Sequence, residues 1–471
     1  MAATLPLMPI YPGGRVPAAS HAAARKLGNQ PVDTTTTLER ERDRHLFGPG
    51  PKRLLSLDGG GVRGAITVAF LEQIEQVLCK HLGKDEVHLG DWFDLIGGTS
   101  TGSIIAGALA LGYSIKDVTR FYRELAPRVF KGHSLWRLLT GRPKFDAEAL
   151  RTEIKEIVGD ITLDTEQLIT GLCVVTKRID TGSPWILANN PRAPYWEANR
   201  GCKLGTLVRA STAAPFYFDP EPITIDDKTQ EQGTFVDGGV TPHNNPSLVL
   251  FLMAILKPYN IGWELGPDKL TIISVGTGSH RSQATPETAA GFFKTAKLAI
   301  HALTSMMSDA QSFALQQMQY LGECPAPWWI NSEVGTLAGD SPPQGKLFRF
   351  LRYDVRLEYE WIERELGRDE VEAAIEKKLT KDEVVRMRAM DDPSIIPDIY
   401  ALAKVAAKKQ VKPEHWIGEL PSWCDGSHPS AGTRPRLPPP KTAPPAAPGL
   451  LAVTMSRLRA RWARAASPTK D

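Results

Sequence analysis

The sequence predicts an α/β sandwich built on a mostly parallel sheet. Two consecutive units of strand, turn and helix begin near residue 52, and three later strand-like segments are separated by stretches long enough for helices. The composition agrees with this class, because 42% hydrophobic and 23% charged residues are ordinary for a globular protein with a large core. A chain of 471 residues exceeds the usual size of a single core, so appendages or a second domain are expected.

The first unit of strand, turn and helix starts at about Lys52. RLLSL has the pattern of a short apolar strand, and a glycine-rich turn leads into a segment with apolar residues at three- and four-residue steps, including Ile66, Phe70 and Ile74. The second unit follows at once, since WFDLIGG resembles a strand and TGSIIAGALALG a helix of small residues. Two parallel strands with crossover helices are therefore expected.

The rest of the fold is predicted from shorter patterns. Strands are expected at 171–176, 234–239 and 270–276, from the segments GLCVVT, TFVDGG and LTIISVG. The stretch from about 285 to 325 has a helical pattern whose aromatic and methionine residues are typical of core packing. KLFRFLRYDV resembles one more strand, and 369–410 resembles two or three amphipathic helices that cap one side of the sheet.

Three parts of the chain are expected. Residues 1–50 are rich in Pro, Ala and Thr and lack a sustained apolar period, which predicts a flexible N-terminal arm. Residues 51–410 are predicted to form one folded domain, with its core motifs in 52–280 and a helical extension in 285–410. Residues 425–471 are predicted to be a proline-rich tail, because nine prolines in the last 46 residues prevent a packed core.

The tail is also strongly basic. From Gly426 onward there are eight basic side chains and one acid, and because the whole chain carries +3, the rest of it carries −4. A mildly acidic body argues against a nucleic-acid-binding core. The segment LLAVTMSRLRARWARAAS has arginines on one side of a possible helix, so binding to a membrane surface or a partner competes with a solvated tail.

The cysteines and the N-terminus bear on the compartment. Five scattered cysteines without a C-x-x-C pair suggest neither a disulfide scaffold nor a zinc ribbon, so a reducing compartment fits best. Pro6, Pro9 and Pro12 interrupt any apolar stretch before it reaches the length of a signal peptide. No run of 18 apolar residues occurs. We expect a cytoplasmic protein that does not span the membrane and that associates with it peripherally at most.

A candidate nucleophile lies in the second turn. Gly98-Thr99-Ser100-Thr101-Gly102 is a G-x-S-x-G motif between a strand pattern and a helix pattern. A nucleophile on this turn has strained backbone angles and crowded neighbours, so Gly98 and Gly102 must lack a Cβ and form the nucleophile elbow. The helix that begins at Thr101 directs its positive end toward Ser100. The pentapeptide alone is a weak signal in a glycine-rich chain, and its context strengthens it.

The glycine-rich turn DGGGVRG at 58–64 has two interpretations. In the first, the backbone N–H groups around Gly60 and Gly61 form an oxyanion hole for the alkoxide that Ser100 creates. Arg63 then binds an anionic headgroup or anchors the loop.

In the second interpretation, Gly59, Gly61 and Gly64 match the dinucleotide fingerprint G-x-G-x-x-G. That fingerprint also requires an acidic residue at the end of the next strand, where this chain has GTSTG instead. A nucleotide triphosphate loop is disfavoured too, because no G-x-x-x-x-G-K-[ST] occurs.

A candidate base leaves a strand pattern onto two glycines. In Phe235-Val236-Asp237-Gly238-Gly239 the glycines allow a sharp turn that brings the carboxylate close to another loop. A base for a serine must lie within hydrogen-bond reach, and burial raises the pKa of an aspartate toward useful basicity. Without the other motifs, D-G-G is most often only a tight turn.

The blocks DGGGVRG, GTSTG and DGG, in this order and each at a strand end, resemble the patatin-like phospholipase family. ASTAAPFYF at 210–218 and HNNP at 243–246 support the resemblance, which covers about residues 52–280. It implies a three-layer α/β/α sandwich with extra C-terminal helices. It also implies hydrolysis of acyl esters of glycerophospholipids, of the phospholipase A type, without metal or other cofactor.

Carried over residue by residue, the resemblance makes Ser100 the nucleophile and Asp237 the base of a dyad without histidine. It assigns the oxyanion loop to Gly59, Gly60, Gly61 and Arg63. The implied partners are a phospholipid or another acyl lipid and a membrane surface, with no nucleic acid and no indicated oligomeric state.

Two alternatives remain at this point. An α/β-hydrolase triad in the order Ser100, Asp237 and His280 has a plausible chain order. In that scheme His280 is essential, whereas in the dyad scheme it is a polar loop residue, and His243 is expected to structure the turn after Asp237. From a different class, the chain can be a non-catalytic lipid-binding or scaffold protein that acts through its basic tail.

Overall fold

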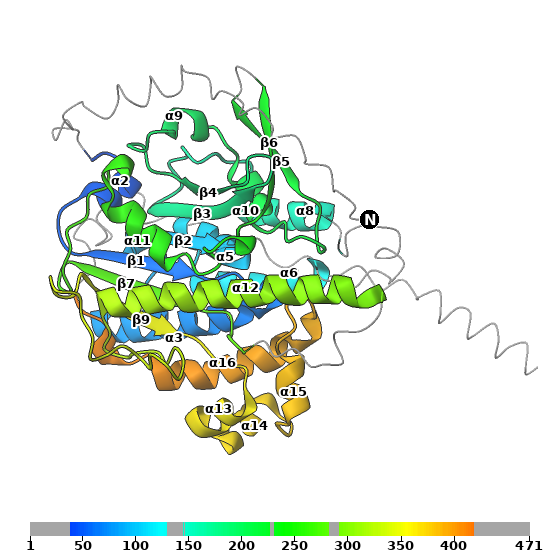
Figure 1. Ribbon diagram of the computed structural model, residues 1–471. Helices are drawn as coiled ribbons and strands as arrows, with labels where there is room; N and C mark the ends of the chain where they lie inside the picture. Colours follow the sequence, from blue (N-terminus) through cyan, green and yellow to red (C-terminus); the bar gives the residue numbers. More distant parts are fainter. Residues whose placement is uncertain (1–37, 130–144, 146, 227–229, 282–291, 419–471) are drawn as a thin grey trace, which may run out of the picture. The chain divides into compact units, whose positions relative to one another are not determined.

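The computed structural model describes residues 38–129, 145, 147–226, 230–281 and 292–418, and a mixed sheet runs through this part of the chain (Figure 1). Its strand order is β5-β6-β3-β2-β1-β7-β9-β8, with β4 paired to β3 outside this path. The central strands β3, β2, β1, β7, β9 and β8 are parallel, β4 and β6 each pair antiparallel with β3, and β5 pairs antiparallel with β6. The bounds are β1 Lys52–Leu57, β2 Leu95–Thr99, β3 Gly171–Arg178, β4 Ser183–Ala188, β5 Glu221–Asp226, β6 Glu231–Asp237, β7 Leu270–Val275, β8 Gly322–Glu323 and β9 Phe348–Tyr353.

Strand β1 is the centre of the sheet. All six of its residues are buried, as expected for a parallel strand that is covered on both faces. It pairs with β2 on one side and β7 on the other, and Leu57 lies opposite both Gly98 and Val275. The turns that follow these three parallel strands therefore emerge side by side at one edge of the sheet.

Helices cover both faces of the sheet. On one face α11 contacts β1 and β7, and α12, which crosses the front of the view in Figure 1, contacts α11, β8 and β9. On the other face α5 contacts β1, β2 and β3, and α3 stacks Phe70 on Tyr353 of β9, with α6 and α16 outside it. The bounds are α2 Glu41–Phe47, α3 Gly64–Leu82, α4 Leu89–Trp92, α5 Thr101–Ala110, α6 Ile115–Val129, α8 Ala147–Val158, α9 Trp196–Asn199, α10 Leu204–Ser211, α11 Ser247–Ile255, α12 Phe292–Leu321, α13 Tyr359–Trp361, α14 Arg368–Ile375, α15 Lys381–Arg386 and α16 Ile396–Gln410.

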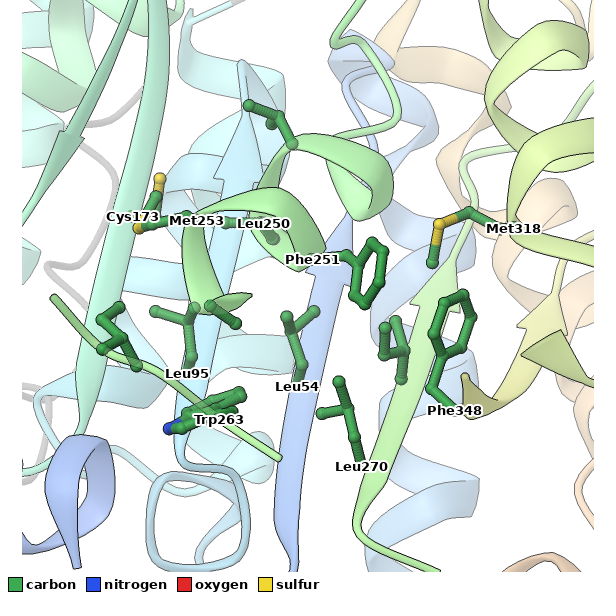
Figure 2. Close-up of a cluster of buried hydrophobic side chains, with 14 of the residues drawn as sticks. Leu54, Leu95, Cys173, Leu250, Phe251, Met253, Trp263, Leu270, Met318 and Phe348 are labelled. Carbon is green, nitrogen blue, oxygen red and sulfur yellow. The ribbon is translucent and has the colours of Figure 1, made fainter. Parts of the chain in front are cut away.

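The core between the sheet and α11 is shown in Figure 2. Leucines from three neighbouring strands meet α11 there, and the rings of Phe251 from α11 and Phe348 from β9 lie 4.6 Å apart between centroids. A Cβ on Gly97 of β2 would lie 2.5 Å from the Leu250 side chain. The glycine at this position therefore lets α11 pack directly on the sheet.

The fold class predicted from the sequence is confirmed, because a mostly parallel sheet lies between helical layers. The predicted strands correspond to β1, β2, β3, β6, β7 and β9, and the predicted C-terminal helices to α14, α15 and α16. The antiparallel strands β4 and β5 were not predicted, since their polar alternation is weak and their pairing depends on β3 and β6.

Two predicted boundaries need correction. The arm assigned to residues 1–50 includes α2, whose Leu46 is buried and whose His45 Nδ1 lies 2.9 Å from Asp94 Oδ1. The helix is ordered because buried partners elsewhere in the chain satisfy its charged side chains, which the local composition does not reveal. The extension at 285–410 is not only helical, because β8 and β9 continue the central sheet beyond β7. Residues 1–37 and the tail at 425–471 lie outside the described residues.

Within the described residues, every helix is too short or too polar to cross a bilayer.

Replacing Phe348 with alanine tests the core between the sheet and α11. The ring is fully buried against Phe251, so its loss is expected to lower the free energy of unfolding by about 3–5 kcal/mol. Phe313→Ala on α12 is the matched control, because that ring is 57% exposed and its loss is expected to cost less than about 1 kcal/mol. Urea unfolding of both variants measures the difference, and equal losses would contradict this packing.

Candidate active site

The register of the sheet brings the three sequence motifs together. DGGGVRG follows β1 and GTSTG follows β2, and these parallel neighbours end side by side. Thr99 of β2 lies opposite Val175 of β3, and the next residue, Thr176, lies opposite Asp237 of β6. Pairing through β3 thus places the D-G-G motif next to the serine turn, although 137 residues separate Ser100 from Asp237.

Ser100 occupies the strained turn that the motif predicts. Its φ is 54°, in the left-handed region that non-glycine residues rarely adopt. A Cβ on Gly98 would lie 2.2 Å from the backbone of Gly102, and a Cβ on Gly102 would lie 2.3 Å from the carbonyl oxygen of Leu57. Both glycines are therefore required sterically. The backbone N–H of Ser100 donates to Ser211 Oγ at 2.9 Å, which holds the strained turn.

The side chains of Ser100 and Asp237 are in direct contact. Ser100 Oγ donates a hydrogen bond to Asp237 Oδ2 at 2.6 Å, and the backbone N–H of Gly239 donates to Oδ1 at 2.7 Å. Burial raises the pKa of Asp237 to about 6, against the opposing effect of these two hydrogen bonds and of the Arg209 charge. The pair thus combines a serine hydroxyl with a carboxylate of raised basicity.

The glycine loop presents two N–H groups beside Ser100. The backbone N–H groups of Gly60 and Gly61 have no acceptor among the described residues, and both glycines line the same cavity as Ser100. A Cβ on Gly60 would lie 2.2 Å from Thr277 Oγ1, and Gly61, with φ of 59°, would clash with the Met390 carbonyl. These N–H groups can therefore receive a negatively charged oxygen without interference from side chains.

Neighbouring segments fix this loop in place. The N–H of Gly59 donates to the Asn244 carbonyl at 3.1 Å, and Thr277 Oγ1 donates to the Gly59 carbonyl at 2.8 Å. The N–H of Val62 donates to the Met390 carbonyl at 2.9 Å. The loop therefore enters the site already ordered, as an oxyanion site requires.

A buried arginine anchors the start of the loop. Arg352, at the end of β9, donates to both carboxylate oxygens of Asp58 at 3.1 and 2.7 Å and to Asp354 at 2.7 Å. All three side chains are at most 1% exposed. Burial raises the pKa of Asp58 to about 6 although the Arg352 charge lowers it. A cation in a strand of the extension thus holds the first residue of the DGGGVRG motif.

Arg63 is buried beside the site, but it does not contact Ser100. Its Nη1 lies 3.5 Å from His280 Nδ1, and its Nε has no partner among the described residues. Burial lowers the pKa of Arg63 to about 10, so the side chain remains a cation at neutral pH. It lines a second cavity together with Gly59, and Ser100 does not line that cavity.

His280, the histidine of the alternative triad, lies beside Arg63, and His243 belongs to the turn after Asp237. Both carboxylate oxygens of Asp237 accept hydrogen bonds from Ser100 and Gly239, while His280 lies beside Arg63, so the structure does not assemble a Ser100, Asp237 and His280 triad. Burial and nearby positive charge lower the pKa of His280 to about 3. His243 uses its backbone, because its carbonyl accepts from Thr99 Oγ1 at 2.7 Å.

A cavity of about 110 Å³ opens above Ser100 and Asp237. Its walls are mostly apolar and come from α5, α8, α12 and the segment that contains Phe216 and Phe218. Phe216 is 54% exposed and lies at φ of 71°, so an apolar ring borders the cavity and also reaches solvent. The cavity suits a flexible hydrocarbon group attached to a carbonyl.

Among the described cysteines, Cys79, Cys173 and Cys324 are free thiols, and Cys424 lies outside the described residues. In the described part of the chain, no three His, Cys, Asp or Glu side chains gather in a way that could hold a metal ion.

Several residues that shape the site were not recognised from the sequence. Arg352, Thr277 and Met390 are far from the glycine loop in the chain and follow no local motif. Ser211 lies in the ASTAAPFYF segment and Asn244 in HNNP, both of which had been noted only as matches to a family pattern. Their roles depend on contacts between distant segments.

Arg352→Gln tests the anchor of the glycine loop. The substitution leaves Asp58 and Asp354 buried without their cation, and the free energy of unfolding is expected to fall by about 3–5 kcal/mol. Arg364→Gln is the control, because Arg364 pairs with Glu365 at the surface and its loss is expected to cost less than about 1 kcal/mol. Chemical denaturation measures both, and a loss below about 1 kcal/mol for Arg352→Gln would contradict the anchor.

Comparisons with known proteins agree with this arrangement. The family model for "Patatin-like phospholipase" matches residues 55–251. Patatin-like protein 4 of Arabidopsis thaliana is 35% identical over 251 residues, which are 49% of this chain and 60% of that protein. The cGAMP-activated phospholipase of Vibrio cholerae serotype O1 is 30% identical over 250 residues, which are 51% of this chain and 68% of that protein.

The chain thus spans about three fifths of the length of the plant relative. Among solved structures, VipD from Legionella pneumophila matches with a TM-score of 0.32 and 11% identity, over 77% of this chain and 67% of that chain. The fold assignment rests on the sheet and helices described above. With its motif region matched by the family model and 68% of the bacterial relative covered, the chain belongs to the patatin-like phospholipase family.

Proposed function

We propose that the chain hydrolyses fatty-acyl esters of glycerophospholipids, with Ser100 as the nucleophile and Asp237 as its base. The observation that carries this proposal is the 2.6 Å hydrogen bond from Ser100 Oγ to a buried Asp237 carboxylate. Ser100 and Asp237 line an apolar cavity together with Gly60 and Gly61, whose backbone N–H groups have no acceptor among the described residues. Family membership supports the acyl-lipid substrate.

In the acylation step, Asp237 takes the proton from Ser100 as Oγ attacks the ester carbonyl. The bond to the carbonyl oxygen loses its double-bond character, and the resulting oxyanion accepts hydrogen bonds from the N–H groups of Gly60 and Gly61. Helix α5, which begins at Thr101, places the positive end of its dipole at the same position. Collapse then expels the lysolipid alkoxide, which takes the proton from Asp237, and leaves an acyl group on Ser100.

In the deacylation step, water replaces the lysolipid. Asp237 accepts a proton from this water, and the hydroxide attacks the acyl-Ser100 carbonyl within the same oxyanion site. Collapse returns the proton to Ser100 Oγ and releases the fatty acid. A dyad suffices for this cycle because the carboxylate contacts the hydroxyl directly, without an intervening imidazole.

The exposed apolar side of the cavity supports action at a membrane surface. Phe216 borders the cavity and is half exposed, so it can contact acyl chains at an interface while the cavity takes up one of them. We therefore propose peripheral association of the protein with its lipid substrate. The basic tail is a second candidate contact, on the ground of its composition.

A non-catalytic lipid-binding function is the alternative from another class. It does not explain why a serine is held at φ of 54° between two sterically required glycines. Strain of this kind persists where the surrounding structure enforces it, and it is concentrated at active sites. The geometry therefore favours the enzyme over the scaffold.

Substitution of the dyad tests the mechanism with a small uncharged ester, p-nitrophenyl butyrate. Ser100→Ala and Asp237→Asn are each expected to lower kcat/KM by at least about a thousandfold, because each removes an atom that takes part in the first step. His280→Ala is expected to lower it by less than about tenfold, since His280 lies beside Arg63 rather than Asp237. Retained activity in Ser100→Ala would rule out the proposed nucleophile.

The same assay needs two controls. Thermal unfolding of each variant shows whether a loss of activity reflects a loss of fold. Each assay is run with and without cGAMP, because the names of the bacterial relatives state activation by this nucleotide. An enzyme that requires such activation is then not mistaken for an inactive protein.

The pH dependence tests Asp237 as the base. The carboxylate must be ionised to accept the serine proton, and burial raises its pKa to about 6, so kcat/KM is expected to rise with pH with a midpoint near 6. A histidine base would behave differently, because the lowered pKa of His280, about 3, leaves it neutral throughout the assay range. A flat profile between about pH 4.5 and about pH 8 would contradict the proposed base.

A further inference from the structure

A second cavity, of about 310 Å³, is lined by Gly59 and Arg63 of the glycine loop, whereas Ser100 lines the first cavity. It shares wall residues with the catalytic cavity, including Tyr217, Asn244 and Met390, so the two spaces adjoin. The far wall is built by residues from 278 onward, which lie outside the segment 55–251 that the family model matches. The properties of this wall are therefore a feature of the extension rather than of the shared motifs.

The wall of the second cavity carries an excess of positive charge. Four arginines line it, against two carboxylates, Glu358 and Asp391. Across the described residues, none of these four guanidinium groups forms an ion pair with a carboxylate. The arginines are Arg63, Arg281, Arg356 and Arg388.

Neutral backbone groups orient two of these arginines. Arg388 Nε donates to the Leu357 carbonyl at 2.9 Å, and Arg356 donates through one Nη to the carbonyls of Trp329 and Ile330. Carbonyl acceptors hold a guanidinium in place without cancelling its charge. Arg63 adds a buried Nε that has no partner among the described residues. An unpaired buried donor of this kind is costly unless a ligand or water satisfies it.

We propose that the second cavity binds the phosphate of the substrate's headgroup, and that Arg356 and Arg388 are its ligands from the extension. The inference rests on the proposed function, because the phosphate enters the cavity only when the ester lies at Ser100. In a glycerophospholipid the phosphodiester is a few bonds from the acyl ester. Adjoining cavities, one apolar and one cationic, match the two ends of such a molecule.

An anionic phosphate fits this wall better than a neutral headgroup does. Guanidinium groups bind phosphate oxygens through paired charged hydrogen bonds, and a phosphodiester carries one negative charge against a net excess of two arginines. His280, whose Nδ1 lies 3.5 Å from Arg63 Nη1, is a neutral imidazole, because burial and the charges of Arg63 and Arg388 lower its pKa to about 3. It therefore adds no positive charge, and the selectivity depends on the arginines.

The kinetic test compares phosphatidylglycerol with diacylglycerol of the same acyl chains, each in neutral detergent micelles. The ratio of their kcat/KM values measures preference for the phosphate. Arg356→Ala and Arg388→Ala are each expected to lower this ratio by about tenfold, and Arg388→Lys, which keeps the charge, to lower it less. Arg368→Ala is the matched control, since Arg368 pairs with Glu372 on the surface of α14.

A binding test separates this proposal from the proposed reaction. Calorimetry measures the affinity of the Ser100→Ala protein for a soluble short-chain phosphatidylglycerol, with and without Arg388→Ala. A Kd that rises by about tenfold supports the phosphate site even if no hydrolysis is detected in any variant. The phosphate-site proposal would be overturned if neither the Kd nor the ratio of the two kcat/KM values changed. It would also be overturned if kcat/KM fell equally on phosphatidylglycerol and on diacylglycerol.

A free phosphate is the other source of the same chemistry. Inorganic phosphate is therefore added to the diacylglycerol assay of the wild type and of Arg388→Ala. Phosphate could inhibit or activate diacylglycerol hydrolysis by the wild type but not by Arg388→Ala. If the ratio of the two kcat/KM values is also unchanged in Arg388→Ala, the cavity binds a free anion and the headgroup proposal is overturned. Competition by phosphate that is selective for phosphatidylglycerol supports it. Circular dichroism and thermal unfolding exclude misfolded variants from the comparison.

Discussion

The active site depends on the buried guanidinium of Arg352. It joins Asp58, at the start of the glycine loop after β1, to Asp354, just after β9, and it also donates to Ser274 of β7. Three neighbouring parallel strands are thereby tied together at the edge where the catalytic turns emerge. Two buried carboxylates would be unstable without a cation, and the cation would be unstable without them, so this cluster forms only as a unit. The cluster fixes Asp58, at the start of the loop, and contacts with Asn244, Thr277 and Met390 hold the residues on either side of Gly60 and Gly61.

The strained serine turn depends on contacts of a different kind. Ser211, from the end of α10, accepts the backbone N–H of Ser100 and donates in turn to the Val175 carbonyl. The backbone N–H of Asp237 donates to Ala213, two residues further along the same segment. One short stretch of chain therefore sets the position of both members of the dyad. This explains how a 2.6 Å contact is maintained between residues on separate strands.

The extension beyond β7 is part of the catalytic unit. It supplies β9 with Arg352, the Met390 carbonyl that holds the glycine loop, and three of the four arginines of the second cavity. The motif region at 52–280 contains Ser100, Asp237 and the glycine loop. The contacts that hold the glycine loop come partly from the extension. The proposed chemistry and the proposed headgroup recognition thus belong to different parts of the chain, and the two cavities adjoin at the glycine loop.

The sequence by itself determined the α/β class and the order of the central strands along the chain, and it pointed to Ser100, Asp237, Gly60 and Gly61 as candidate site residues. These were predictable because strained turns and tight approaches demand glycines at fixed spacing, and buried parallel strands are continuous apolar runs. Only the tertiary structure decided that Asp237 contacts Ser100 directly, that His280 lies beside Arg63, and that Arg352 anchors Asp58. Those contacts join residues up to 294 positions apart, and burial, which is the largest influence on the pKa of Asp237, exists only once the chain has folded.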